Sequence, residues 1–233
     1  MTPEKHWFPY SDDPIKGING QAFYKFDVEI DADRLDDEIC KGLAQSNLSH
    51  LGLVPGEKPP ELEEGRPPFD ENYQDPEPGM TNQESRRYRT FKREIDNPWA
   101  FVVTLKPNKF MTKEQDLYPW SNVIDRMPYT KEVIESLPFS EIGRAAIYGT
   151  WAGSSVPCHR DEPSGKPRPH INFSPNHYRP VYVWDTVKKE KVYLPKDYNF
   201  YAYNVTDYHG VDPLPYFSYT VRVDGKYLKE IDE

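Results

Sequence analysis

The sequence predicts a mainly β protein with flanking helices, whose core is a jelly roll or a related double-sheet barrel. From residue 98 onward, short β-prone segments recur with turn residues between them, as in these all-β architectures. No internal repeat with a fixed period is visible, so a repeat architecture is not expected. The 233 residues are enough to bury one sizeable core without a disulfide framework or a structural metal.

Local patterns place the individual elements. Residues 21–31 alternate apolar and polar side chains, as a half-buried strand does. A helix follows, capped by Asp31 or Asp33 and ended by Asn47 with Ser49, in which Leu35, Ile39 and Leu43 share one face. A second helix is expected near 129–137. The core strands are expected at 99–105, 145–152, 169–174, 181–186, 191–194, 198–205 and 217–224.

The chain is expected to divide into two regions. Residues 54–80 hold seven prolines and eight carboxylates, so they cannot continue a regular element and are interpreted as a long loop that could cover a site. Residues 1–97 then form a strand and helix region that carries this loop and packs on the core, and residues 98–233 form the jelly-roll core.

Composition limits the possible partners and the compartment. No apolar run is long enough to cross a membrane, and the N-terminus lacks the apolar stretch of a secretory signal. The net charge of −9 argues against general nucleic-acid binding. Cys40 and Cys158 form no C-x-x-C pair and are interpreted as reduced thiols. A cytoplasmic protein without membrane partners is therefore expected.

The pair His159 and Asp161 carries the first indication of chemistry. On an extended segment, side chains two residues apart lie on the same face. Such a pair can supply two of the three protein ligands of the facial triad that holds non-haem Fe(II). A third ligand must come from a distant strand, and the candidates are His170, His177 and His209. His177 lies in a turn-like context and is expected at the surface.

Arginines near these histidines indicate an anionic ligand. In the last predicted strand, Arg222 shares a face with Ser218 and Thr220, and a buried arginine is costly unless an anion meets it. That anion is either a dicarboxylate cosubstrate or an Asp or Glu of the protein. Arg168 and His170 would likewise point the same way on their strand, which suits binding of a carboxylate at two points.

Taken in order, these residues resemble a known family. H-x-D at 159–161, R-x-H at 168–170, a distal histidine at 209 and an arginine on the following strand resemble the aspartyl/asparaginyl β-hydroxylase-like Fe(II)/2-oxoglutarate oxygenases, over about residues 145–225. The membrane-anchored peptidyl hydroxylases of that family lack the aspartate ligand, so Asp161 makes the free-proline cis-hydroxylase branch the closer comparison. Arg222 lies thirteen residues after His209, a longer spacing than in the family, with the extra turn DPLPY between them.

The resemblance implies a fold, a site and a reaction. It implies a double-stranded β-helix core of the jelly-roll, cupin-like kind. By that resemblance His159, Asp161 and His209 bind iron, and Arg168 and His170 hold the C1 end of 2-oxoglutarate. Arg222 holds the distal carboxylate, helped by Ser218 or Thr220. The implied activity is O2-dependent hydroxylation of a C–H bond in a free amino acid or small derivative, with succinate and CO2 as co-products.

Substrate selection and the alternative functions rest on other residues. Candidates for substrate contact are Tyr148, Trp151, Trp184 and the basic residues Arg86, Arg87 and Arg89. If they contact no substrate, the three aromatic residues pack in the barrel and the three arginines lie on a solvated face. Three alternatives stay open: a peptidyl hydroxylase of the Asp, Asn or Pro type, a cupin-like iron enzyme that uses no 2-oxoglutarate, and a jelly-roll binding protein without catalysis.

Overall fold

The structure is a computed structural model that describes residues 14–44, 100–107, 119–150, 152–153, 155–159 and 169–228. Of His159 and a few other strand residues only the backbone is described. The described part is mainly β, as predicted, with few helices. The helices are α1 (Ala32–Ala44), the 3-10 helix η2 (Ile124–Arg126) and α3 (Pro128–Ser136). The strands are β1 (Tyr24–Phe26), β2 (Ala100–Pro107), β3 (Phe139–Thr150), β4 (Val156–His159), β5 (His170–Phe173), β6 (Val181–Asp185), β7 (Glu190–Tyr193), β8 (Phe200–Ala202), β9 (His209–Val211) and β10 (Ser218–Tyr227).

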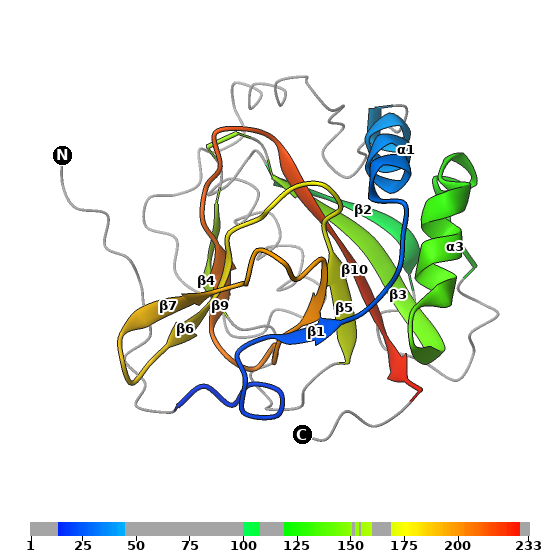
Figure 1. Cartoon of the computed structure of the whole chain (residues 1–233). Helices are drawn as coiled ribbons and strands as arrows, with labels where there is room; N and C mark the ends of the chain where they lie inside the picture. The colour runs from blue at the N-terminus through cyan, green and yellow to red at the C-terminus, as the bar shows by residue number, and fades with distance from the viewer. Residues whose placement is uncertain are drawn as a thin grey trace, which may run out of the picture.

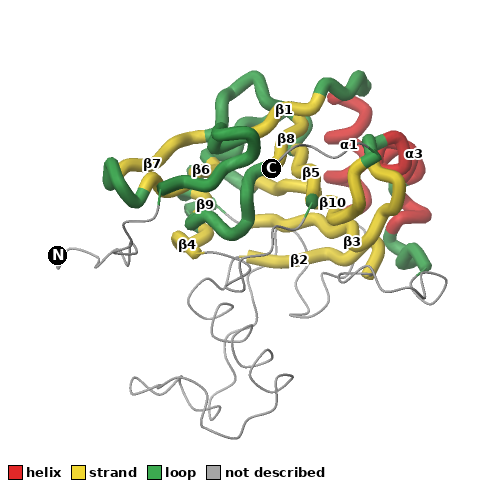
Figure 2. The backbone as a smooth tube through the Cα atoms, turned by 90° about the horizontal axis from the view of Figure 1, so that it is seen from below, coloured by secondary structure: helices red, strands yellow, loops and turns green. Residues whose placement is uncertain are grey.

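The strands form two antiparallel sheets. The large sheet has the order β1-β8-β5-β10-β3-β2 and the small sheet the order β4-β9-β6-β7 (Figures 1 and 2). From β3 to β10 the chain passes from one sheet to the other at every connection except the β6–β7 hairpin. Strands that are neighbours in a sheet are therefore mostly distant in sequence, and this brings β4 beside β9 in the small sheet.

Two apolar clusters hold these layers together. α1 and α3 lie side by side against one face of the large sheet (Figures 1 and 2), where Leu35 and Ile39 of α1 pack with Ile134 of α3 and Val221 of β10. The second cluster lies between the sheets and is smaller. It joins Val181, Val183 and Val211 of the small sheet to aromatic residues of the large-sheet side, Phe23, Tyr201 and Tyr203.

Most predicted elements are confirmed, with shifted ends. The helix expected after residue 31 is α1 as far as Ala44, and the helix near 129–137 is α3, which begins at Pro128 where the missing N–H costs nothing. β3 starts six residues before the predicted strand and β10 runs three residues beyond it. β4 and β9 were not predicted. The loop 54–80 and the boundary at 97/98 lie outside the described residues.

The N-terminal region contributes directly to the large sheet. β1 pairs with β8, with Tyr24 opposite Ala202 and Phe26 opposite Phe200. Before β1, the backbone amides of Lys16 and Gly17 donate to the carboxylate of Asp207, at 3.0 and 2.7 Å. Among the described residues, no helix has both the length and the apolar character that a membrane crossing requires.

Candidate metal and anion site

The small sheet places two of the predicted metal ligands opposite each other. In the antiparallel pair of β4 and β9, His159 and His209 are partner residues, although fifty positions separate them in the chain. Val183 of β6 is the partner of His209 on the other side. Because Val183 packs between the sheets, His209 lies on the inner face of the small sheet as well.

The imidazole of His209 is buried and held in one orientation. Its Nδ1 lies 2.9 Å from the backbone carbonyl oxygen of Asp207. A carbonyl only accepts hydrogen bonds, so Nδ1 is the donor, and in the neutral imidazole the lone pair then lies on Nε2. Metal-binding histidines in proteins commonly donate their other ring N–H to a carbonyl or carboxylate in this way. The side chain of His209 therefore has the chemistry of a metal ligand that binds through Nε2.

The inner face of the large sheet, which is turned toward the small sheet, carries many buried polar residues. On β10, Tyr219, Val221 and Val223 belong to the cluster beneath the helices, so the residues that alternate with them face the small sheet. The same alternation holds on β5, where Ile171 and Phe173 face the helices. The buried polar residues of β5 and β10 on this inner face are His170, Asn172, Ser218, Thr220, Arg222 and Asp224.

Arg222 meets a carboxylate of the protein on this face. Its Nε donates to Asp224 at 2.9 Å, and Nε of Arg144 donates to the other oxygen of Asp224 at 3.0 Å. Asp224 is fully buried. Burial alone would raise the pKa of this carboxyl, but the nearby Arg222 and Arg144 outweigh it and hold the pKa below its usual value. An ion pair, one of the two partners expected for Arg222, is thus present.

His170 lies at the same end of β5 and β10, beside the ion-pair cluster. It is the register partner of Asp224, and its backbone is fixed by the hydroxyl of Tyr227, which donates to the His170 carbonyl at 2.7 Å. Its ring packs on Tyr203 at a centroid distance of 5.1 Å, and Tyr203 packs in turn on His209 at 4.7 Å. One aromatic ring therefore links His170 of the large sheet to His209 of the small sheet.

Ser218 and Thr220 belong to a hydroxyl network beside this cluster. Ser218 shares a hydrogen bond of 2.9 Å with Thr150, and Thr220 shares one of 3.0 Å with Ser174. Arg179, from the connection between β5 and β6, completes the network through Thr220 and Thr150. No sequence pattern pointed to Arg179, because it precedes its strand and belongs to no alternating run.

The remaining predicted residues are partly described. Tyr148 is half-buried on β3 as the register partner of Thr220, with the Arg144 guanidinium 5.6 Å from its ring centre. Trp184 is buried on β6 and alternates with Val183, so it lies on the other face of that strand. The residues outside the described ranges are Arg86, Arg87, Arg89, Trp151, Asp161 and Arg168.

His177 was predicted to lie at the surface, but it is partly buried. Its side chain is 17% exposed and its ring packs on Tyr219 at a centroid distance of 4.5 Å. Its Nδ1 lies 2.8 Å from the carbonyl oxygen of Pro175, and its Nε2 lies 3.2 Å from the donating backbone N–H of Tyr219. These backbone contacts tie the β5–β6 connection to β10, so the ring fills a structural position.

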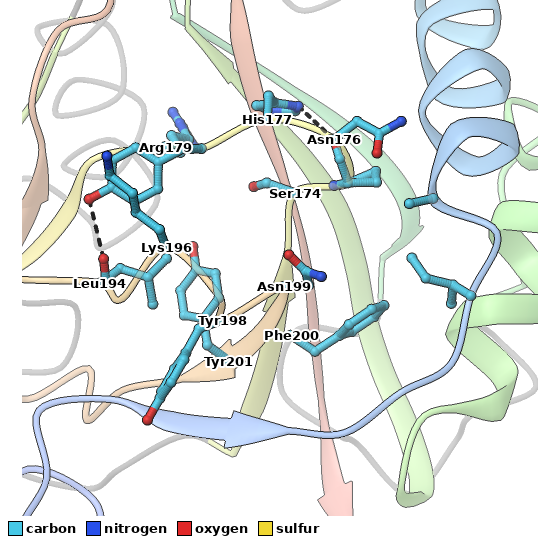
Figure 3. A pocket seen from close by; sticks show the side chains of 14 residues that line it. Ser174, Asn176, His177, Arg179, Leu194, Lys196, Tyr198, Asn199, Phe200 and Tyr201 are labelled. Atoms are coloured by element: carbon cyan, nitrogen blue, oxygen red, sulfur yellow. Dashed lines mark hydrogen bonds between the residues drawn. The ribbon is translucent and has the colours of Figure 1, made fainter.

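A cavity of about 270 Å³ opens near this connection. Figure 3 shows Ser174, His177 and Arg179 along one side, and Lys196, Tyr198 and Asn199 from the β7–β8 connection along the other. Tyr201 of β8 also lines it. The cavity thus adjoins the hydroxyl network through Ser174 and Arg179.

Gly210 allows β9 to approach its neighbours closely. A Cβ at this position would lie 2.5 Å from the Tyr182 hydroxyl oxygen and 2.7 Å from the backbone oxygen of Val156. Gly210→Ala is therefore expected to push β9 away from β4 and β6, lowering stability by about 1–3 kcal/mol through overpacking and lowering metal affinity about 10-fold or more by displacing the neighbouring His209.

Metal titration and denaturant unfolding of Gly210→Ala check this expectation. Gly153→Ala is the control. Gly153, unlike Gly210, has a positive φ of 79°, and a Cβ there meets no atom within 4 Å, so any loss of stability in Gly153→Ala reflects backbone strain and not overpacking. Equal metal affinity in wild type and Gly210→Ala would show that β9 tolerates a Cβ without moving His209.

Comparisons with known proteins give weak similarity only. No protein-family model and no curated protein matches the sequence. A prolyl-4-hydroxylase structure from Pseudomonas putida aligns with a TM-score of 0.40 at 7% identity, covering 89% of this chain and 94% of that chain. A viral collagen prolyl hydroxylase from Paramecium Bursaria Chlorella virus-1, in its 2OG complex, aligns with a TM-score of 0.38 at 12% identity, covering 89% and 96%.

A further structure, an oxidoreductase of the 2OG-Fe(II) oxygenase family from Burkholderia pseudomallei, aligns with a TM-score of 0.37 at 10% identity. That alignment covers 64% of this chain and 83% of that chain. Similarity at this level establishes neither a shared activity nor shared site residues.

Proposed function

We propose that this protein is a Fe(II)/2-oxoglutarate-dependent dioxygenase that hydroxylates a C–H bond of a free amino acid or a small amino-acid derivative. The observation that carries the proposal is the register of β4 and β9, which sets His159 opposite His209. The imidazole of His209 is buried and oriented, which suits it to donate a nitrogen lone pair to a metal ion. The alternation of strands between the two sheets is the connectivity of a double-stranded β-helix, which we propose as the core.

His159, Asp161 and His209 would hold the iron, a donor set of two imidazoles and one carboxylate that suits non-haem Fe(II) and leaves positions open for further ligands. When bound, the iron together with 2-oxoglutarate and O2 supplies the oxidising power for hydroxylation, with succinate and CO2 as co-products. The chain itself binds and orients the reactants and keeps water out of the site. Its contribution lies in the buried inner face of β5 and β10 described above.

The cosubstrate would lie against this face. Arg168 and His170 would hold its C1 end. Arg144 and Arg222 place two guanidinium groups on one buried carboxylate, Asp224, so the described side chains at this end of the sheet favour an anionic ligand. Tyr148, on the neighbouring strand, would contact the amino-acid substrate, together with Trp151 and the arginines 86, 87 and 89. Trp184 is left out of this set, because it lies on the face of β6 that is turned away from the large sheet.

Succinate formation tests the proposal directly. Protein loaded anaerobically with Fe(II) is mixed with 2-oxoglutarate, O2 is admitted, and succinate is measured with and without a pool of the twenty amino acids. We expect Fe(II)-dependent succinate that rises with one amino acid and is absent in His159→Ala. Uncoupled turnover that no amino acid stimulates would instead favour a peptide substrate.

Two results would contradict the proposal. Protein that fails to take up Fe(II) would favour the binding protein without catalysis. Protein that holds Fe(II) but forms no succinate would favour an iron enzyme that uses no 2-oxoglutarate.

A further inference from the structure

Arg179 is a buried cation in an unusual position. It lies in the connection between β5 and β6 and is only 4% exposed. Its Nη1 donates to the hydroxyl of Thr220 at 2.9 Å and its Nη2 to the hydroxyl of Thr150 at 3.3 Å. Both threonines lie on the inner face of the large sheet, so the guanidinium group lies between the sheets.

This guanidinium donates to no carboxylate among the described residues. Its described partners are the two hydroxyls and, more weakly, the backbone oxygen of Tyr148 at 3.5 Å, and its Nε has no hydrogen-bond partner there. Burying an arginine with hydroxyl partners alone is costly, because a hydroxyl does not compensate for the lost hydration of a full charge. Arg222 differs in this respect, since it has Asp224.

A second donor on the same face lacks an acceptor. Asn172, the register partner of both Arg222 and Tyr201, is buried, and its Nδ2 has no hydrogen-bond partner among the described residues. Two buried donors without an acceptor on one face indicate a ligand that carries acceptor oxygens.

The position of Arg179 suits the far end of a ligand that starts at the metal. Arg179 and Tyr201 line the same cavity, Tyr201 stacks on Tyr203 at a centroid distance of 6.4 Å, and the Tyr203 ring is the one that packs on His209. Thr220, which accepts from Arg179, lies two residues from Arg222 on β10, so the spacing along the strand is about 7 Å. Arg179 is therefore a neighbour of the ion-pair cluster and belongs to the same interior.

We propose that Arg179, rather than Arg222, binds the distal carboxylate of 2-oxoglutarate, with Thr150 and Thr220 holding its guanidinium in place and Asn172 as a further donor. The inference rests on the proposed function and identifies the residue that selects a dicarboxylate over a monocarboxylate 2-oxoacid. Arg222 then serves mainly to balance Asp224.

The test compares two ligands that differ only in the distal carboxylate. Calorimetric affinities of 2-oxoglutarate and 2-oxopentanoate are measured on protein loaded with Mn(II), so that binding is read without turnover. For wild type we expect 2-oxoglutarate to bind about 10- to 100-fold more tightly, which is the effect of a hydrogen bond to a charged group. Arg179→Gln should lose this preference, with the affinity for 2-oxopentanoate unchanged.

Two further variants separate binding from a structural role. Arg179→Lys keeps the charge but loses the planar fork of donors, so it should weaken the binding of 2-oxoglutarate more than that of 2-oxopentanoate and gives a second test if Arg179→Gln does not fold. Thr150→Val removes one hydrogen bond of the guanidinium without removing the charge, and should weaken 2-oxoglutarate only a few-fold. A purely structural arginine would instead lower the affinity for both ligands to the same extent.

The outcomes distinguish this inference from the proposed function. Full preference for 2-oxoglutarate in Arg179→Gln, together with its loss in Arg222→Gln, would overturn the role of Arg179 and leave the oxygenase assignment standing. A wild type that binds both ligands equally would overturn the distal-carboxylate site alone. A wild type that binds neither ligand would contradict the proposed function itself.

Discussion

Replacing His209 with alanine is expected to lower Fe(II) affinity by more than about 100-fold, because losing only a supporting partner of a metal ligand already costs 10- to 100-fold. The variant also removes the ring that packs on Tyr203 at a centroid distance of 4.7 Å. Anaerobic equilibrium dialysis against Fe(II), followed by metal analysis, measures the change. Succinate formation should fall in parallel.

His177→Gln is the matched control for this experiment. His177 is a partly buried histidine that, like the buried His209, has a ring nitrogen in contact with a backbone carbonyl and a ring that packs on a tyrosine. The variant should keep wild-type Fe(II) affinity even if its melting temperature falls. If His209→Ala and His177→Gln bind Fe(II) as tightly as wild type, the role of His209 as a ligand is wrong.

Asp224→Asn is expected to cost about 3–5 kcal/mol of unfolding free energy, the usual effect of removing one partner from a buried ion pair. The substitution leaves Arg222 and Arg144 without the carboxylate that both contact. Chemical denaturation at neutral pH measures the loss. Asp197→Asn, which breaks the exposed pair with Lys25, should leave stability unchanged within error.

The same carboxyl makes stability depend on pH in a defined direction. Burial acts to raise the pKa of Asp224, but its two arginines prevail, so the pKa in the folded state lies below that of the unfolded chain. Its stabilising contribution is therefore complete above about pH 4 and is lost as the pH falls through the folded-state pKa. The stability difference between wild type and Asp224→Asn should shrink below pH 4. A difference that stays constant down to pH 2 would contradict the ion-pair explanation.

The long elements of the fold could be predicted because their periodicity is strong. α1 repeats Leu35, Ile39 and Leu43 at helical spacing, and β10 alternates apolar and polar side chains. The two strands that carry the histidines could not be predicted in the same way. β4 and β9 are short, and they contain Pro157 and Gly210, residues that are typical of turns rather than strands. Their extended form depends on pairing with distant strands.

The candidate site, too, could be predicted from the sequence only in part. The sequence pattern left three histidines open as the partner of His159, and only the family resemblance singled out His209. The register of β4 and β9 sets these two histidines opposite each other. The partner of Arg222 was visible in principle, since Asp224 lies two residues further on the same face of its strand. Arg179 had no such signal, because only the crossing of the chain between the sheets brings it to Thr150 and Thr220.

The contact between Asp207 and the N-terminal segment has a consequence for the order of folding. Asp207 supplies the carbonyl that orients His209, and its carboxylate accepts from the amide of Gly17, 190 positions earlier in the chain. Closing so long a loop is slow compared with forming a local hairpin. A chain therefore fixes the segment that carries Asp207 and His209 only after residues 16 and 17 have met the β8–β9 connection. Metal uptake during refolding should accordingly lag behind helix formation and mark the final step of assembly.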